Sequence, residues 1–384
     1  MTDSLRGTTA VVGVAESQLG LVGPGLSPLD LMGQASHAAL AEAGLTTRDV
    51  DGLFTASSVY PAAGLDTAEY LGIQPRYIDG TVIGGSSFVS HVLHAAAALR
   101  SGLCDVALVT YASNQRSNVG KLVARTQLNA YEAPYGPRFP VSMYALAAAR
   151  HMHEFGTTRE QLADVAVAAR EWARLNPKAF SRDPLTRDDV INARMVSSPL
   201  TVRDCCLVTD GGGAVVLTRA ERARDLPRPP VYLLGAGEAT DHATISQMPD
   251  LTTTSAVQSS RRAYDMAGLS ASDIDVVQLY DAFTINPILF LEDLGFCAKG
   301  EGGAFVADGR IAPGGVLPVN TNGGGLSYCH PGMYGILLII EAVRQLRGEC
   351  GERQVPGART ALTHGNGGVL SSQVTAIFGT EATV

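Results

Sequence analysis

The sequence predicts a layered α/β protein built from two similar halves. Apolar runs typical of buried strands alternate with longer helical patterns along most of the 384 residues. In addition, the helix–turn–strand segment at residues 41–54 aligns without gaps with residues 265–278, which pairs Gly44 with Gly268 and Asp49 with Asp273. A repeat at this separation is longer than any solenoid period, so it indicates two related domains.

The first half follows this alternation in order. Its patterns predict a buried strand at 8–17, an amphipathic helix at 27–45 in which Gly44 is the C-cap, a strand at 49–57, an alanine-rich helix at 85–103 and a buried strand at 104–113.

Residues 114–200 depart from the alternation. They carry more charged and aromatic residues, and their pattern predicts helices at 142–155 and 159–175. The run DCCLVTDGGGAVVLT at 204–218 then returns to a strand. We therefore interpret 114–200 as an excursion from the first unit.

The second half again predicts α/β elements. VVQLYDAFTINPILFLEDLGF, at 276–296, indicates a strand that runs into a helix, and the glycine-rich segment from 320 leads into an apolar helix. Near the C-terminus, 358–379 predicts a strand, a histidine, a Gly-Asn-Gly-Gly loop and a second strand. We expect one unit at 1–220 and the other at 221–384.

Composition and charge exclude several classes of protein. A net charge of -8 with mixed signs gives no basic stripe for nucleic acid, and no segment has the length and pattern of a membrane span or a secretory signal. The six cysteines show no ligand-like spacing, so we expect neither a metal site nor disulfides. Only 17% of the residues are charged, which favours an oligomer, and we expect a cytoplasmic protein.

Glycine-rich segments precede an apolar helix in each half. In the first half they place Gly85, Ser86 and Ser87 at a helix start, and in the second half Asn322 lies in the corresponding segment. The unpaired amides of two helix starts would bind a carbonyl oxygen that becomes anionic. The two serines also fit as helix caps.

His330 precedes Pro331, which suits the first position of a helix. The positive end of that helix would favour a neutral imidazole that donates a hydrogen bond to a thioester or enolate oxygen. A structural histidine that caps the helix explains the residue equally well.

Tyr280 stands where a strand meets a helix, with Asp281 beside it. A tyrosine at this place is more often a packing residue, and its ordinary pKa makes it a poor base unless a neighbour such as Tyr328 assists. Asp281 is also a candidate N-cap.

In the C-terminal loop, Gly365 and Gly367 would let a ligand approach the backbone, and His364 lies at the loop's edge. A tight hairpin also explains these glycines.

In this order within a duplicated α/β chain, these segments resemble the thiolase superfamily, in particular its sterol-carrier-type thiolases and lipid-transfer-protein relatives. Residues 151–179 and DCCLVTDGGGAVVL also look like the loop domain and following strand of that subfamily. The resemblance covers nearly the whole chain. It implies a five-layered α-β-α-β-α fold with a loop-domain insertion.

The family's catalytic residues are only partly present. Its Gly-His-Pro step is similar to Cys329-His330-Pro331, so His330 carries over. The position of the nucleophilic cysteine falls near Gly85, the segment similar to HDCF reads YDAF with Tyr280, and the second cysteine position falls at His364. An acyl-enzyme mechanism needs a thiolate that this sequence lacks at those positions.

The resemblance to steroid side-chain aldolases implies retro-aldol cleavage of a β-hydroxyacyl-CoA, with Tyr280 as base, Tyr328 or His364 as its helper and His330 as donor to the thioester oxygen. The CoA thioester is then the substrate, and no bound cofactor is needed. The resemblance also implies a homodimer core and a small partner built from an OB-fold and a zinc ribbon. Two alternatives stay open: an acyltransferase that acts through Ser86 or another nucleophile, and a lipid or acyl-CoA carrier without catalysis.

Overall fold

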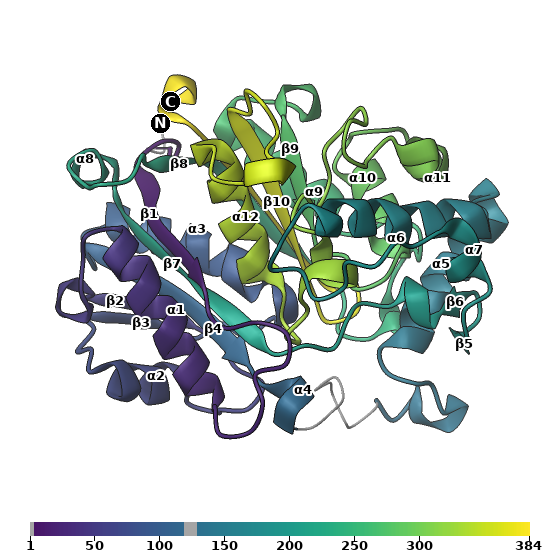
Figure 1. The fold of residues 1–384 in the computed structure, drawn as a ribbon, viewed down its shortest axis with the longest axis horizontal. Helices are drawn as coiled ribbons and strands as arrows, with labels where there is room; N and C mark the ends of the chain where they lie inside the picture. Colours follow the sequence, from purple (N-terminus) through teal and green to yellow (C-terminus); the bar gives the residue numbers. More distant parts are fainter. Residues whose placement is uncertain (1–3, 119–128) are drawn as a thin grey trace.

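The computed structural model describes residues 4–118 and 129–384, and it contains one large sheet and a small hairpin (Figure 1). The large sheet has the strand order β3-β2-β4-β7-β1-β8-β11-β10-β9. At its middle, β1 and β8 pair through only two residue pairs, Ala10 with Tyr232 and Val11 with Val231. The sheet therefore consists of two well-paired parts joined at a short seam.

The strands of the two parts and of the hairpin have the following bounds: β1 (Thr9–Glu16), β2 (Gly52–Thr55), β3 (Tyr77–Asp79), β4 (Val106–Ser113), β5 (Met195–Ser197), β6 (Leu200–Thr201), β7 (Gly211–Arg219), β8 (Val231–Thr240), β9 (Val276–Leu279), β10 (Thr360–Gly367) and β11 (Ser372–Gly379). The α-helices are α1 (Pro28–Glu42), α2 (Ala63–Leu71), α3 (Ser87–Arg100), α4 (Gln115–Asn118), α5 (Val141–Phe155), α6 (Arg159–Arg174), α7 (Arg187–Ile191), α8 (Ala220–Ala223), α9 (Ala256–Ala267), α10 (Ile285–Asp293), α11 (Gly302–Val306) and α12 (Gly335–Arg347).

Two helices lie between the two parts of the sheet. Both α3 and α12 contact each other and strands on both sides of the seam, among them β7 and β10. On the outer faces, α1 covers β1, β7 and β4, while α9 covers β8 and β11. This is the five-layered α-β-α-β-α arrangement expected from the sequence, and one continuous apolar core runs through it.

The repeated segment takes the same local structure in both halves. In each copy a helix ends at a glycine of positive φ, Gly44 or Gly268, and a short turn with a capping box follows it. Each helix also packs closely on a glycine of its strand, because a Cβ at Gly13 or at Gly235 would lie 2.1 Å from a carbonyl oxygen of α1 or α9. The duplication therefore extends to the packing of helix on sheet.

The excursion leaves the first unit between β4 and β7. It holds α5, α6, α7 and the β5–β6 hairpin, and it lies beside the second half of the molecule (Figure 1). Part of the predicted excursion, residues 119–128, falls outside the described residues. Helix α5 contacts α10, and α6 packs on the turn at Gly324–Tyr328. Within the described residues, none of the helices has the length and apolar character needed to cross a bilayer.

Candidate active site

A cavity of about 880 Å³ opens where the two halves and the excursion meet. Segments that are far apart in the sequence line it, among them Gly84 and Gly85, Phe139 and Tyr144, Tyr280 and Phe283, His330 and Met333, and Asn366 to Gly368. The cavity thus contains four short stretches that the sequence analysis selected. The segment at the start of α5, with Phe139 and Tyr144, also lines the cavity, and the sequence analysis did not predict this contribution.

Tyr280 and His330 face each other in this cavity. The Tyr280 hydroxyl lies 3.2 Å from Nε2 of His330, and the two rings meet edge to face. The same hydroxyl accepts a hydrogen bond from the Tyr334 backbone N–H at 3.2 Å and lies 3.2 Å from the Gly332 carbonyl oxygen. A proton on Tyr280 can therefore pass directly to the imidazole.

Surrounding hydrogen bonds fix the backbone of His330. Its N–H donates to Oγ1 of Thr209 at 2.8 Å, and its carbonyl oxygen accepts from the Gln115 side chain at 2.8 Å. Nδ1 is buried and has no hydrogen-bond partner among the described residues. Nε2 is therefore the ring nitrogen that can exchange a proton with a neighbour.

Burial keeps both groups uncharged. It raises the pKa of Tyr280 well above 10, although the Tyr334 amide opposes this, and it lowers the pKa of His330 to about 4. The cause predicted for the neutral histidine was wrong: α12 begins only at Gly335, so His330 is not at the first turn of that helix. Because both groups are neutral, Tyr280 is not a phenolate that could act as a base by itself. The pair can instead act as a proton relay, in which Tyr280 passes a proton to His330.

The Tyr280 ring occupies the space beside Gly85. A Cβ built on Gly85 would lie 2.1 Å from Cε2 of Tyr280 and 2.5 Å from its hydroxyl oxygen, distances at which atoms overlap. Residue 85 can therefore carry no side chain while Tyr280 keeps this position.

Tyr334 is a site residue that the sequence analysis missed. Besides its amide contact with Tyr280, its hydroxyl donates to Oδ1 of Asn322 at 2.9 Å, and its ring stacks on His330. Asn322 is therefore close to the site, but it acts through Tyr334 and does not line the cavity. The available signal was the aromatic residue four positions after His330.

Asp281 is not the N-cap considered from the sequence, because α10 begins at Ile285 after Thr284. Its carboxylate instead accepts from the backbone N–H groups of Gly325, at 2.6 Å, and Leu326. Burial raises the pKa of Asp281 to about 7. This residue ties the strand end that carries Tyr280 to the glycine-rich turn that leads to His330.

Tyr328 was expected to assist Tyr280, and the geometry contradicts this. Its hydroxyl donates to Oε1 of Glu16 at 2.9 Å, on the side of β1. Glu16 also binds Arg344 and Lys178, and these charges hold its pKa near 2 despite burial. Tyr328 thus belongs to a buried ionic cluster that joins β1 to α12.

His364 also fails to reach Tyr280. Its Nδ1 lies 2.9 Å from the Thr375 hydroxyl, its Nε2 lies 2.9 Å from Oε1 of Gln373, and its ring packs against Phe290 of α10. The predicted loop at this point is in fact the end of β10, which continues to Gly367. The His364 side chain therefore faces the outer layer. Its contact with Tyr280 is through the backbone, where the Tyr280 N–H donates to the His364 carbonyl oxygen.

The small residues expected to bind substrate divide into two groups. Gly85 and Gly367 line the cavity, whereas Gly365 packs against Ser86 at the start of α3. The Ser86 hydroxyl donates to the Ile83 carbonyl oxygen at 3.1 Å, and that of Ser87 donates to the Gly84 carbonyl oxygen at 2.7 Å. These serines stabilise the helix start, and neither hydroxyl bonds to a histidine among the described residues.

The cavity also contains polar groups that the sequence analysis passed over. Asn366 donates to the Tyr144 hydroxyl at 2.8 Å, and Cys206 lies in the same wall. Burial raises the pKa of the Cys206 thiol well above 9, so it is protonated. The six cysteines are free, and no cluster of three or more metal-ligating side chains occurs in residues 4–118 and 129–384.

Comparisons with known proteins find relatives over most of the chain. Residues 237–380 match the family model for a thiolase C-terminal domain-like region. The chain is 36% identical to an acetyl-CoA acetyltransferase of Methanothermobacter thermautotrophicus over 96% of this chain and 98% of that protein. It is equally identical, at 36%, to a steroid side-chain-cleaving aldolase of Thermomonospora curvata, over 94% of this chain and 96% of that protein.

Two further relatives are a lyase and an aldolase by name. The chain is 36% identical to a 17-hydroxy-3-oxo-4-pregnene-20-carboxyl-CoA lyase of Mycobacterium tuberculosis, over 96% of this chain and 98% of that protein. Among solved structures, an Ltp2-ChsH2(DUF35) aldolase superposes with a TM-score of 0.90 at 35% identity, over 98% of this chain and 99% of that one. Sequence identity alone does not separate the acetyltransferase from the aldolases, so the site must do so.

Proposed function

This chain belongs to the thiolase superfamily, in the branch of the steroid side-chain-cleaving aldolases, and we propose that it cleaves a β-hydroxyacyl-CoA by a retro-aldol reaction. One observation supports this choice above the others. Tyr280 and His330 lie in hydrogen-bond contact in the cavity, and the Tyr280 ring fills the space that a nucleophilic side chain at residue 85 would need.

The first step removes the proton of the β-hydroxyl group. Because burial raises the pKa of Tyr280, the tyrosine acts as a neutral relay: Oη takes the substrate proton while its own proton moves to Nε2 of His330. The electrons of the O–H bond form the new carbonyl group. Those of the Cα–Cβ bond move into the thioester and give an enolate.

The second step stabilises and then quenches this enolate. Its oxygen lies against the glycine-rich wall at Gly84, Gly85, Gly367 and Gly368, where backbone N–H groups can approach without side chains. Each well-aimed donor contributes about 3 to 4 kcal/mol. The proton on His330 returns through Tyr280 to Cα, which releases a shorter acyl-CoA and restores both residues. His330 thus serves Tyr280 in this proposal, rather than the thioester oxygen as first expected.

The substrate class follows from the relatives and the cavity. We propose a steroid side-chain CoA thioester that gives a ketone or aldehyde and acetyl-CoA or propionyl-CoA. The volume of about 880 Å³ lies in the range of pockets for large organic ligands, and Phe139, Phe283 and Met333 supply apolar walls. No separate cofactor takes part in these steps.

We also propose a homodimer that binds a small partner subunit with an OB-fold and a zinc ribbon, in the cytoplasm. The exposed aromatic side chains Tyr131 and Tyr135, at 84% and 87% exposure, lie at a second apolar pocket with Leu146 and support a protein contact there. The Ltp2-ChsH2(DUF35) structure is itself an aldolase of two named components.

The test is direct product analysis. The protein, with and without the candidate partner, is incubated with steroid and small branched β-hydroxyacyl-CoAs, and the carbonyl product is identified by mass spectrometry. Tyr280→Phe removes the relay and should lower kcat roughly a hundredfold to ten-thousandfold while acyl-CoA binding persists. Tyr264→Phe, which loses a hydroxyl bonded to Leu294 outside the cavity, is the matched control. Near-normal turnover by Tyr280→Phe would exclude this mechanism.

The relative with acetyltransferase activity makes acyl transfer the second candidate. That reaction needs a nucleophile at the cavity wall. Residue 85 is a glycine that packs against Tyr280, and the Cys206 thiol is protonated, so neither supplies the nucleophile that acyl transfer needs. The retro-aldol reaction needs no nucleophile and uses the contact between Tyr280 and His330.

A further inference from the structure

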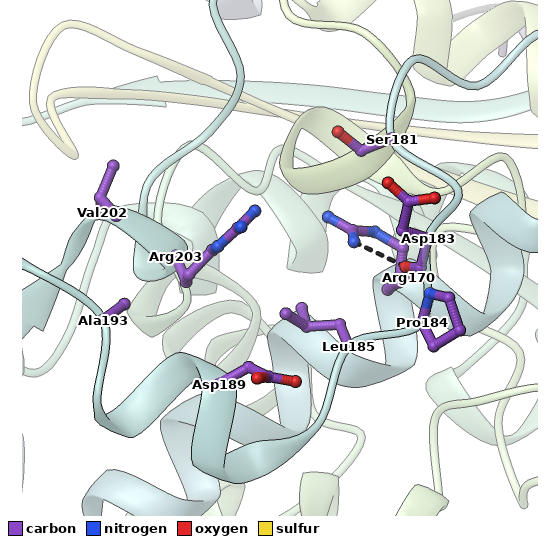
Figure 2. Close-up of a pocket in the computed structure, with 9 residues that line it drawn as sticks. All are labelled: Arg170, Ser181, Asp183, Pro184, Leu185, Asp189, Ala193, Val202 and Arg203. Atoms are coloured by element: carbon purple, nitrogen blue, oxygen red, sulfur yellow. Dashed lines mark hydrogen bonds between the residues drawn. The ribbon is translucent and has the colours of Figure 1, made fainter.

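A second pocket, of about 420 Å³, lies in the excursion and is separate from the catalytic cavity (Figure 2). It is bounded by α6, by the residues around α7 and by the short turn at Val202–Asp204. None of its lining residues lines the catalytic cavity. Its most notable members are two arginines, Arg170 and Arg203.

Arg170 is a buried and fixed cation. It is 5% exposed, its Nε donates to the Ser327 hydroxyl at 3.0 Å, and its Nη1 donates to the Asp183 carbonyl oxygen at 2.8 Å. Both partners are neutral, so neither offsets the charge. Burial, and after it the positive charge of Arg203, lower the pKa of Arg170, and the negative charge of Asp183 opposes this shift.

Arg203 approaches from the opposite side. In Figure 2 the guanidinium ends of Arg203 and Arg170 point toward each other across the pocket. The side chain of Arg203 has no hydrogen bond and no ion pair with any described residue. Two like charges therefore face one space, and neither guanidinium group forms a direct ion pair there with a described residue.

Two carboxylates lie in the same pocket and act on the arginines at longer range, without a direct ion pair. Asp183 and Asp189 line the pocket, yet neither lies within 4.0 Å of a guanidinium nitrogen of Arg170 or Arg203. Asp189 instead accepts from the hydroxyl and the backbone N–H of Thr186 as part of a helix cap.

The same region does pair another arginine. The more exposed Arg187 binds both Asp164 and Asp308. The excursion thus supplies direct ion pairs for a surface arginine, whereas the two arginines of this pocket have only more distant carboxylates.

We propose that this pocket binds a phosphate group between Arg170 and Arg203. A guanidinium group presents planar N–H donors that match phosphate oxygens, and a bound dianion removes the repulsion between the two cations. The Ser181 side chain lines the same wall and offers a hydroxyl donor, while Leu185 and Val202 provide apolar sides for an organic body.

Phosphate chemistry has two possible sources here. One is a phosphate of the CoA part of the proposed substrate, in which case the assignment of the source rests on the proposed function. The other is inorganic phosphate or a separate phosphate ester. The site itself depends on neither choice, because direct binding can be measured without turnover.

The experiment compares wild type, Arg203→Gln and Arg261→Gln. Arg203 is exposed and has no bonds to lose, so its variant should fold, and Arg261 is a surface arginine on α9 that controls for the change in net charge. Inorganic phosphate is titrated against chloride of equal ionic strength, and binding is followed by calorimetry and by the Tm. We expect phosphate-specific stabilisation of the wild type and of Arg261→Gln, and binding weaker by roughly tenfold or more in Arg203→Gln.

The source is resolved by titrating the same proteins with CoA and with pantetheine, which lacks the phosphates of CoA. Weaker binding of CoA but not of pantetheine to Arg203→Gln would identify a CoA phosphate. Unchanged CoA binding, with weaker binding of inorganic phosphate, would identify a separate phosphate ligand. The proposal is overturned if phosphate stabilises the wild type no more than chloride does, or if Arg203→Gln binds phosphate as the wild type does. None of these results depends on product formation, so failure of the proposed reaction would be seen separately.

Discussion

Replacing Gly85 with alanine should displace Tyr280 and stop catalysis although the new side chain is a single methyl group. The added Cβ would lie 2.1 Å from Cε2 of Tyr280, whereas ordinary contacts of such an atom begin at 3.4 Å. The tyrosine ring must therefore retreat by more than about an ångström, a misplacement that can cost on the order of a hundredfold in rate. That movement breaks the 3.2 Å contact between the tyrosine hydroxyl and His330.

The same clash should also lower stability. Overpacking a filled interior costs typically about 1–3 kcal/mol. Removing the ring by Tyr280→Ala frees the space, so Gly85→Ala should cost much less in that background. A double-mutant cycle then gives a coupling free energy of about 1–3 kcal/mol between the two positions.

Two assays check this reasoning. Product formation from a β-hydroxyacyl-CoA gives kcat for Gly85→Ala, and urea unfolding of wild type, both single variants and the double variant gives the coupling. Gly80→Ala is the matched control for a methyl group on a glycine outside the cavity, because the nearest neighbour of a Cβ there would be the Thr55 carbonyl oxygen at 3.8 Å. Gly85→Ala with near-wild-type kcat, or additive losses of stability in the cycle, would show that the ring and residue 85 do not compete for space.

The other expectations concern residues outside the relay. Tyr328→Phe should keep nearly normal kcat and lose only stability, measured by urea unfolding, because its hydroxyl serves Glu16. His364→Gln should also keep turnover, and its free energy of unfolding relative to wild type should rise by about 2 kcal/mol from pH 7 to pH 5. The reason is that burial lowers the pKa of His364 to about 4, so the unfolded wild-type chain binds that proton first and the folded state loses stability as the pH falls below about 6.5. Wild-type protein incubated with acyl-CoA should show no acyl adduct by intact mass, because the Cys206 thiol is protonated; an adduct would favour acyl transfer.

Local sequence patterns placed Tyr280 correctly at the end of a strand, but they placed His330 and Asp281 too close to helix starts. Tyr280 follows a strand and His330 follows a glycine-rich segment, and both positions depend on neighbours within a few residues. The five layers were also predictable through the family resemblance, and the repeated glycines Gly44 and Gly268 both have positive φ just after their helices. Such features are encoded by short-range geometry and by apolar periodicity.

The direction of individual side chains was not predictable in the same way. Tyr328 turns away because Glu16, far earlier in the chain, accepts its hydroxyl hydrogen bond. His364 turns away because β10 extends through the predicted loop, and alternate residues of a strand face opposite sides. In both cases a long-range pairing decides where the polar atoms go, and a single sequence does not display that pairing.

The overlap between residue 85 and the ring at 280 also limits which pairs of residues this helix start can hold. A side chain at residue 85 and the tyrosine ring at residue 280 compete for the same space, whereas glycine at residue 85 is compatible with a smaller residue at 280. A nucleophilic side chain could therefore be introduced at residue 85 only together with a smaller residue at 280, and that change would remove the hydroxyl that contacts His330. The two chemistries exclude each other at this wall of the cavity.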